Sequence, residues 1–502
     1  RSAAWAEWLA RRTAARTAAR TAGQTGARTA GQTGARTAGQ TGARTAGQTG
    51  ARTAGQTGAR TAARTAEQTV GEVTDLGLPR NRDDGQAGAS GRPALRRCTH
   101  LEPERFAAEI WGRQASLSPA ELLPRGFGDL LDADAVDTLI SRRGLRTPFL
   151  RVVRDGRTLP EARFTRSGGA GAGIGDQVDD GALARLFADG STIVLQGLHR
   201  THDPVLEFAQ ALAGELGHPV QANAYVTPPQ SRGFGAHYDV HDVFVLQVAG
   251  MKRWIIHDPV LSHPRRDQPW TDRRPAVEAA ATTAPLLDVV LRPGDALYLP
   301  AGFLHAAESL GDTSIHLTAG VHTWTRAHLV AALVARLADV AELREPLPLG
   351  VDVAAAASIE PALRAVVEAV RAAAGRTAAA DLVGDLAGQA ATASRPAPVG
   401  PLAQARALAA LHPGSRLRRR PGLAATLLPV DAGPGGPPRL LLRTPELTVT
   451  LPAAAAGAVR RLLAGEVLAV ADLGPGDDVL MTDAERMDVA HTLVRHALVV
   501  TA

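Results

Sequence analysis

The sequence predicts a mainly β core with flanking helices, followed by a helical segment and a small α+β module. Short β-type runs separated by turn residues fill the stretch from residue 192 to residue 321. Apolar residues at helical spacing follow Trp324, and strands and helices alternate near the C-terminus. Sixteen of the eighteen aromatic residues lie between Phe106 and Trp324, the stretch that holds most of the β-type runs.

Residues 1–65 have a low-complexity sequence. Five copies of ARTAGQTG run from Ala19 to Gly58, and no copy has a large apolar side chain, so stacked copies would have nothing to bury. We therefore expect a disordered tail rich in arginine, threonine and glycine. Eleven arginines and one glutamate give this tail a charge of +10, so the net charge of +5 leaves −5 for residues 66–502. A mildly acidic folded part predicts no specific nucleic-acid partner.

Length and composition exclude several classes of protein. A chain of 502 residues indicates roughly two to four domains. The single cysteine, Cys98, excludes a disulfide scaffold, a thiolate zinc cluster and a cysteine-ligated iron–sulfur centre. No apolar run approaches the ~20 residues needed to cross a bilayer, so we expect a soluble, cytoplasmic chain without a membrane partner.

The first folded domain is predicted to span residues 99–325, after a polar linker at residues 66–98. A capping box is expected at Ser118–Glu121, and helices are expected at Asp132–Gly144, Asp180–Gly190 and Pro204–Leu216. The β-type runs are Thr192–Leu198, Ala224–Thr227, Val243–Val248, Arg253–His257, Leu287–Leu291, Ala296–Leu299 and Ser314–Val321. Residues 243–258 and 287–300 are each predicted to form a hairpin. Many short strands at such spacing indicate a sandwich or a barrel.

The rest of the chain divides into three predicted parts. Residues 326–393 form a helical segment, in which Ala327–Leu343 and Pro361–Ala374 have apolar residues at helical spacing. A stretch rich in proline, glycine and alanine marks a linker at residues 394–415. The order of strands and helices over residues 416–502 predicts a winged-helix-like module. Its basic cluster, Arg416 and Arg418–Arg420, is interpreted as a solvated loop.

The residue pattern also contains a candidate metal site. His237 and Asp239 are two residues apart, so on a strand their side chains project from the same face. With a distant histidine they would form the two-histidine, one-carboxylate set that holds non-haem Fe(II) and leaves three positions open. His305 is the third candidate, because the turn Pro300-Ala301-Gly302 before it would fold a later strand back alongside the first.

Other histidines are weaker candidates. His241 shares the face of His237, but four residues of strand span ~13 Å, too far for both to bind one ion. His316 and His322 fit positions beside the ligands or in the core. A lone His-x-Asp pair lies most often on the surface, so the prediction rests on the longer pattern around it.

The residues around these ligands resemble a known family. The runs NAYVTPPQSRGFGAHYDVHDVFVLQVAGMKRWIIHDPV (Asn223–Val260) and GDALYLPAGFLH (Gly294–His305) resemble the JmjC-type cupin oxygenases. They are most similar to the ribosomal-oxygenase branch of the Fe(II)- and 2-oxoglutarate-dependent dioxygenases. The resemblance implies a double-stranded β-helix (cupin) barrel, a dimerising helical segment and a C-terminal winged-helix domain.

Residue roles follow from this resemblance. It implies that Fe(II) is bound by His237, Asp239 and His305, with no separate acid or base. Lys252 matches the residue that binds the distal carboxylate of the cosubstrate 2-oxoglutarate, and Asn223 and Tyr225 match residues that line its pocket. Thr318 stands near the position where relatives often have a serine beside the cosubstrate.

The chemistry agrees with the role of Lys252. A 2-oxoacid that chelates Fe(II) fills two open positions, and its far carboxylate then needs a cation inside the barrel. Lys252 is the single lysine of the chain, against fifty-four arginines. We expect it across the predicted hairpin, on the strand adjacent to the ligands.

The resemblance implies an enzyme that hydroxylates a protein side chain and produces succinate and CO2. Relatives act on arginine or histidine of ribosomal proteins, so the expected partners are a ribosomal protein and a second copy of this chain. Two alternatives stay open. One is the same chemistry on a small molecule or a peptide natural product. The other is a non-catalytic cupin whose winged helix binds nucleic acid, against which the intact ligand set argues.

Overall fold

The computed structural model describes residues 91–231, 233–393, 395–430, 438–474 and 481–502. The predicted tail at residues 1–65 and most of the predicted linker at residues 66–98 therefore lie outside the described residues. Within the described ranges, none of the helices has both the length and the apolar character needed to span a membrane.

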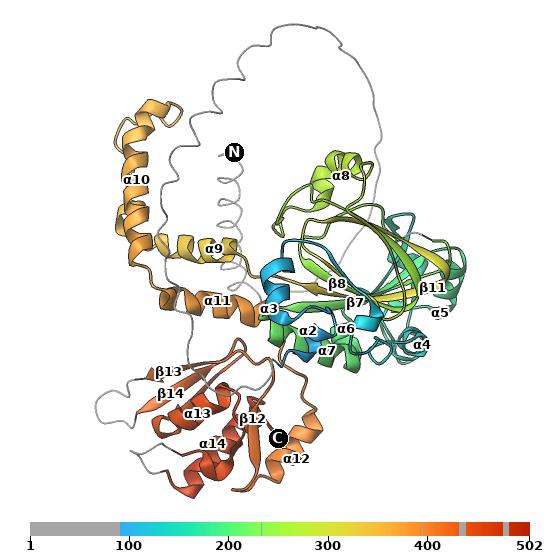
Figure 1. Ribbon diagram of the computed structural model, residues 1–502. Coiled ribbons are helices and arrows are strands. Elements are labelled where there is room, and N and C mark those ends of the chain that lie inside the picture. Colours follow the sequence, from blue (N-terminus) through green and yellow to red (C-terminus); the bar gives the residue numbers. More distant parts are fainter. Residues whose placement is uncertain (1–90, 232, 394, 431–437, 475–480) are drawn as a thin grey trace, which may run out of the picture. The chain divides into compact units, whose positions relative to one another are not determined.

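The predicted mainly β core with flanking helices is confirmed (Figure 1). Its main sheet has nine strands, and every pairing in it is antiparallel. Along the sheet the order is β1 (Ser116–Ser118), β10 (Ala296–Leu299), β8 (Asp242–His257), β11 (Leu304–Val321), β7 (Val220–Thr227), β6 (Thr192–Leu195), β2 (Leu150–Arg154) and β3 (Arg157–Thr158), and β9 (Leu287–Leu291) also pairs with β8. A separate pair is formed by β4 (Thr165–Arg166) and β5 (Gln177–Val178).

Both predicted hairpins are wrong, because β8 is one continuous strand of sixteen residues. A hairpin over residues 243–258 would turn at Ala249-Gly250, where β8 and β11 instead have an irregularity at which their register shifts. Gly250 has φ +60°, and a Cβ there would lie 2.2 Å from the Thr313 carbonyl oxygen, so only glycine fits. β9 and β10 do not pair with each other: β9 pairs with the second half of β8 and β10 with the first half.

Alternation along the strands separates the hydrophobic core from the barrel interior. On β7, the side chains of Ala222, Ala224 and Val226 are buried in the main core, and α7 packs on this strand. Asn223 and Tyr225 project from the opposite face, because successive strand residues point to opposite sides. The helices of this domain are α2 (Pro93–Arg96), α3 (Pro103–Arg105), α4 (Ala133–Arg142), α5 (Asp180–Ala188), α6 (Leu198–Thr201), α7 (Asp203–Leu216) and α8 (Arg274–Ala280).

The domain begins earlier than the predicted boundary at residue 99. Leu95 and Cys98 are buried in the main core. The Glu215 carboxylate accepts hydrogen bonds from the backbone N–H groups of Ala94 and Leu95, at 3.0 and 2.8 Å. The predicted linker therefore does not extend to residue 98, because apolar side chains and a buried helix end fix this stretch to α7.

Two helix-start predictions have different outcomes. Asp132 caps α4 as expected, since its carboxylate accepts from the Ala135 N–H at 2.7 Å. The capping box at Ser118–Glu121 is wrong, because Ser118 ends strand β1 and its buried hydroxyl bonds to His100. Only a short 3-10 turn, Ala120–Leu122, follows it.

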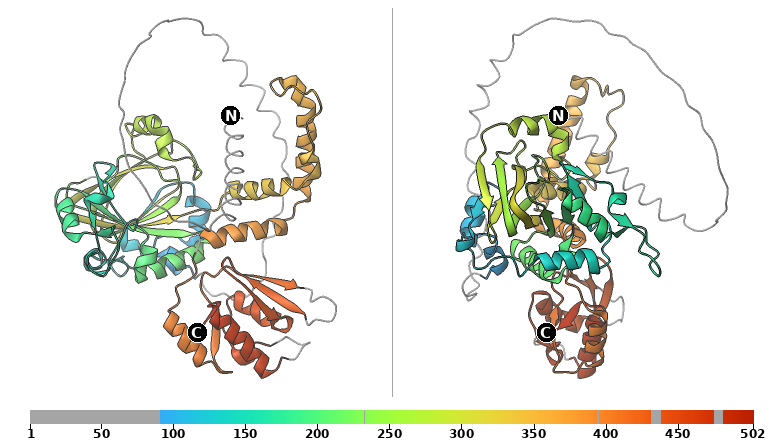
Figure 2. Two further views of the ribbon diagram at one scale, coloured as in Figure 1. Left: turned by 180° about the vertical axis from the view of Figure 1, so that it is seen from behind. Right: turned by 90° about the vertical axis from the view of Figure 1, so that its right-hand side faces the viewer.

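The helical segment contains α9 (Arg326–Leu337), α10 (Ala356–Arg376) and α11 (Ala379–Ala393). The helices α9 and α11 lie side by side, as Figure 1 and the reverse view in Figure 2 both show. The Arg336 guanidinium on α9 lies 3.7 Å from the Asp385 carboxylate on α11.

The C-terminal module contains strands and helices in alternation. They are α12 (Pro401–Ala409), β12 (Arg416–Arg419), β13 (Thr426–Val430), β14 (Arg439–Arg443), β15 (Thr448–Pro452), α13 (Ala456–Leu463), β16 (Leu468–Ala469), α14 (Asp483–Arg495) and β17 (Val499–Thr501).

Within the C-terminal module, two expectations need correction. The predicted linker at residues 394–415 contains α12, and the Gln404 amide donates to the carbonyls of Val494 and Val499 at 2.8 and 2.9 Å. This stretch is therefore part of the module. The basic cluster is not a solvated loop either, because Arg419 lies on β12 and donates to the Leu463 carbonyl, and Arg420 donates to the Ala397 carbonyl.

Candidate active site

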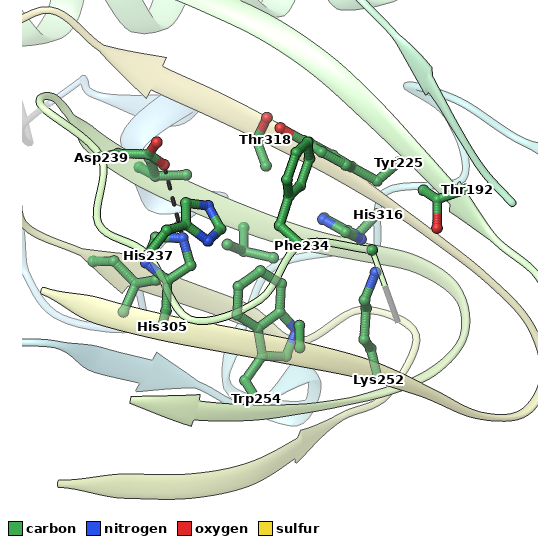
Figure 3. Close-up of a pocket in the computed structure, with 15 residues that line it drawn as sticks. Thr192, Tyr225, Phe234, His237, Asp239, Lys252, Trp254, His305, His316 and Thr318 are labelled. Carbon is green, nitrogen blue, oxygen red and sulfur yellow. Dashed lines mark ion pairs between the residues drawn. The ribbon is translucent and has the colours of Figure 1, made fainter. Parts of the chain in front are cut away.

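The three predicted ligands meet at one end of the barrel. One ligand atom each from His237, Asp239 and His305 lies within 4.8 Å of the others. The His305 Nε2 atom lies 3.8 Å from the Asp239 Oδ2 atom, and the two imidazole ring centres are 4.4 Å apart (Figure 3). This spacing leaves room for one ion between the three side chains.

A backbone pairing brings the two histidines together. The His237 N–H donates to the His305 carbonyl at 3.1 Å, and the His305 N–H donates to the His237 carbonyl at 2.8 Å. His237 and Asp239 lie in the segment before β8, so the prediction that they share a regular strand is wrong. Asp239 is held from the other side, because the Gly302 N–H donates to its carbonyl at 2.9 Å.

Hydrogen bonds orient both imidazoles as ligands. His237 Nδ1 lies 2.8 Å from the Gly235 carbonyl oxygen, and His305 Nδ1 lies 3.0 Å from the Phe303 carbonyl oxygen. A carbonyl can only accept, so each Nδ1 carries the proton and each Nε2 keeps a lone pair for a metal.

The electrostatics of the site favour metal-binding protonation states. Burial raises the pKa of Asp239, but the histidines 241, 305 and 237 together lower it below its ordinary value. Burial, and then the neighbouring His237, lowers the pKa of His305 to about 4. At neutral pH the site therefore offers a carboxylate and a neutral imidazole, the forms that bind a metal.

A cavity inside the barrel connects the ligand cluster to Lys252 (Figure 3). The side chain of Lys252 is 3% exposed, and its Nζ donates to the Thr227 hydroxyl at 3.0 Å. No carboxylate of the described residues forms an ion pair with it, and burial lowers its pKa to about 7. A buried cation without a counter-charge is costly, so this end of the cavity suits an anion.

The strand that carries Lys252 differs from the prediction. It lies on β8 itself, beyond the irregularity at Gly250, and not on a separate hairpin strand. Its partner on β11 is Ser309.

The other predicted residues divide between two neighbouring spaces. Tyr225 and Thr318 line the cavity that holds Lys252. Asn223 lines an adjoining polar hollow, which Tyr225 and Thr318 also border, and its Oδ1 accepts from the Gly197 N–H at 3.0 Å. The Tyr225 ring lies parallel to that of His316, with centres 4.9 Å apart.

Sequence reasoning missed several residues of the cavity wall. The missed residues that line it include Thr192, Phe234 and Trp254. His316, which the sequence places beside the ligands or in the core, also lines the cavity. His316 alternates with Thr318 on β11, so strand periodicity could have placed it on the cavity face. Its Nδ1 is buried without a hydrogen-bond partner, and burial, and then Lys252, lowers its pKa well below the ordinary value. The imidazole is therefore neutral.

The comparisons with known proteins identify the barrel. Residues 200–329 match the family model of the JmjC domain. The chain contains a JmjC domain. The match covers the ligand cluster and Lys252, and it ends near the start of α9, so most of the helical segment and the whole C-terminal module lie outside it.

Curated relatives of the JmjC domain are ribosomal oxygenases and related proteins. Human ribosomal oxygenase 1 is 29% identical over 265 residues, which cover 49% of this chain and 38% of the human protein. The bifunctional lysine-specific demethylase and histidyl-hydroxylase NO66 of Drosophila persimilis is 43% identical over 100 residues, which cover 20% of this chain and 14% of that protein. This chain therefore spans less than half the length of these relatives.

A similar solved structure is that of YcfD, a ribosomal oxygenase from Escherichia coli, in complex with cobalt and 2-oxoglutarate. It is 16% identical, with a TM-score of 0.45, and the similarity covers 80% of this chain and 98% of YcfD.

Proposed function

We propose that this chain is an Fe(II)- and 2-oxoglutarate-dependent dioxygenase that hydroxylates a side chain of a protein. One observation supports this proposal above all: the cluster of His237, Asp239 and His305 faces a cavity that contains the buried ammonium of Lys252, which forms no ion pair with any described residue. The cluster has the donor set for Fe(II), and the cation suits the far carboxylate of a dicarboxylate chelated to the ion.

The residues present fit the proposed iron and cosubstrate. Both histidines have their Nδ1 atoms bonded to backbone carbonyls, which leaves two Nε2 atoms and one carboxylate for the ion. With 2-oxoglutarate and O2, such an iron centre supplies the oxidising chemistry that yields succinate, CO2 and a hydroxylated product.

The cavity residues would position the cosubstrate. The Lys252 ammonium would bind the distal carboxylate, with the Thr227 hydroxyl beside it. The stacked rings of Tyr225 and His316 and the Trp254 ring would form aromatic walls, and Thr318 would give a polar contact near the ligands. Asn223 would hold the backbone of Gly197 at the border of the adjoining hollow.

The proposed substrate is an arginine or a histidine of a ribosomal protein. The names of the matched relatives, ribosomal oxygenase and histidyl-hydroxylase, support this substrate class.

The test is reconstitution of the full chain with Fe(II) under anaerobic conditions, followed by addition of O2 and 2-oxoglutarate. We expect succinate release that is stimulated by ribosomal-protein peptides and abolished in His237→Ala. His491→Ala, an exposed histidine of α14, is the matched control and should behave as wild type. Equal succinate release by wild type and His237→Ala would rule out the proposed dioxygenase activity.

The helical segment is proposed to form a homodimer interface. Among its described residues only Ala332 and Ala373 are buried, while Leu329, Val330 and Leu363 are exposed. Three helices with so small a core leave apolar surface that a second copy would cover. Light scattering should give twice the chain mass for wild type and a lower mass for Leu363→Glu.

The C-terminal module is proposed to be winged-helix-like. Its helices α13 and α14 share one hydrophobic core with strands β12, β14, β15 and β17, which supports an independently packed unit. Deletion of residues 395–502 should leave Fe(II) and 2-oxoglutarate binding by the JmjC domain intact.

A further inference from the structure

A second space adjoins the cavity of the proposed cosubstrate. This polar hollow and the cavity share Tyr225, Asp239, Val243 and Thr318, so the hollow reaches the metal cluster from another side. The remaining residues of its wall are Arg151, Gln196, Gly197, His199, Gln221, Asn223, His241 and Gly320. A side chain that enters the hollow would approach the metal without crossing the space of the cosubstrate.

The wall of the hollow contains one permanent cation and one carboxylate. The cation is Arg151, and the carboxylate is Asp239, which belongs to the metal cluster. Once a divalent ion and the chelating carboxylate of 2-oxoglutarate are bound, the ion and the two carboxylates, that of Asp239 included, balance one another. The field that remains inside the hollow is therefore positive and comes from Arg151.

Contacts with its surroundings hold Arg151 beside the hollow. It lies on β2, and its guanidinium carbon is 5.1 Å from the centre of the Phe234 ring. Its Nε atom is buried without a hydrogen-bond partner, and no carboxylate of the described residues forms an ion pair with it. The guanidinium is close enough to Asp239 and Tyr225 to affect both electrostatically.

Besides the hydroxyls of Tyr225 and Thr318, the other polar side chains of the wall are amides and imidazoles. The Gln221 Nε2 and His241 Nε2 atoms are 3.2 Å apart, and the Nδ1 of His241 is buried without a partner. The His199 Nδ1 atom accepts from the Ala222 N–H at 3.0 Å. A Cβ at Gly320 would lie 3.1 Å from both Gln221 and His241, so glycine at this position keeps the hollow open.

We propose that Arg151 is a specificity-determining residue that makes the hollow accept an uncharged, hydrogen-bonding side chain and reject a cationic one. The accepted class is an imidazole or a carboxamide, and the rejected class is a guanidinium or an ammonium. This inference rests on the proposed function, because it assigns the hollow to the substrate side chain. A cation would meet the Arg151 charge, and the one carboxylate of the wall, Asp239, would already be bound to the metal.

The test uses the full chain loaded with Co(II) and 2-oxoglutarate and three blocked amino acids: the N-acetyl N-methylamides of histidine, asparagine and arginine. Paramagnetic broadening of the ligand NMR signals reports binding close to the metal. For wild type we expect broadening of the histidine and asparagine ligands, and at least 10-fold weaker binding of the arginine ligand.

Two charge-reversal variants on β2 distinguish the effect of a charge in the hollow from the effect of a changed net charge. Arg151→Glu should reduce the preference for the histidine and asparagine ligands over the arginine ligand at least 10-fold, or invert it. Arg154→Glu makes the same charge change at an exposed position of β2 and should leave the preference unchanged. If the arginine ligand binds wild type as well as the histidine ligand, if no ligand is broadened, or if Arg151→Glu leaves the preference unchanged, the proposal is overturned.

A separate measurement shows whether the proposed metal and 2-oxoglutarate binding itself fails. The visible absorbance of bound Co(II), and its change on addition of 2-oxoglutarate, is measured before any amino acid is added. Absence of these signals would overturn the proposed function together with this inference. Normal signals followed by a wrong ligand preference would overturn the role of Arg151 alone.

Discussion

The Lys252 ammonium lies 3.0 Å from the Thr227 hydroxyl, and the Thr227 hydroxyl lies 3.3 Å from that of Thr192. These hydroxyls are the polar groups that compensate the buried charge, and neither of them is ionised. A ligand that brings a carboxylate to this end of the cavity would supply the missing counter-charge.

Replacement of Lys252 by methionine should therefore weaken the binding of 2-oxoglutarate. A hydrogen bond to a charged group contributes about 1.5–3 kcal/mol, which corresponds to a dissociation constant about 10- to 100-fold higher. Isothermal titration with Co(II)-loaded protein measures this change. Arg253→Met, the next residue on β8 with an exposed side chain, is the control and should bind as wild type. Unchanged affinity in Lys252→Met would contradict the assigned role.

The same lysine predicts how the stability of the ligand-free protein depends on pH. The ordinary pKa of lysine is 10.5, and burial lowers that of Lys252 to about 7. Between these values the unfolded chain binds more protons than the folded one, so the free energy of unfolding rises with pH. The dependence should flatten in Lys252→Met and with saturating 2-oxoglutarate, whose carboxylate keeps the lysine charged. Urea unfolding between pH 7 and pH 10 measures it, and an equal slope in Lys252→Met would exclude this origin.

Strand alternation explains why most of the barrel could be predicted. Ala222, Ala224 and Val226 alternate with polar residues on β7, and this pattern alone separates the core face from the site face. The helices at residues 133–142, 180–188 and 203–216 agree with the prediction from their capping residues and the spacing of their apolar residues.

The two failed hairpin predictions have one physical cause, because local turn chemistry does not determine long-range pairing. Ala249-Gly250 and Pro293-Gly294-Asp295 both favour a turn, yet the first lies inside β8 and the second joins two strands that each pair with β8. Phe234 and Thr192 come from separate segments of the chain, so only the folded structure shows that they share one cavity.

Loss of the single carboxylate should remove the metal. Asp239→Ala leaves only the two imidazole ligands, so the Co(II) affinity should fall by more than the roughly 10- to 100-fold typical of a change in an outer partner of a ligand. The Trp254 ring centre lies 6.0 Å from that of His305, so quenching of tryptophan fluorescence by Co(II) measures binding. Asp288→Ala removes an exposed carboxylate and should bind Co(II) as wild type. Equal quenching in both variants would place the metal elsewhere.

The turn before His305 should tolerate no side chain at Gly302. Its φ is +93°, and a Cβ there would lie 2.3 Å from the Leu261 carbonyl oxygen, so Gly302→Ala must shift backbone. We expect a loss of more than about 2 kcal/mol of unfolding free energy, as for other strained backbone positions. Because the Gly302 N–H also holds the Asp239 carbonyl, the Co(II) affinity should fall as well.

Gly311 provides the matched comparison for this prediction. Its φ is +71°, but none of the described atoms would lie within 4 Å of a Cβ at this position, so Gly311→Ala meets only the intrinsic cost of a left-handed residue, about 1–2 kcal/mol. Its Co(II) affinity should equal that of wild type. Urea unfolding and Co(II) titration of the two variants measure the difference. If Gly302→Ala binds Co(II) as tightly as Gly311→Ala, the turn does not position the ligands, and the alignment of His305 with Asp239 depends on the backbone pairing of the histidines alone.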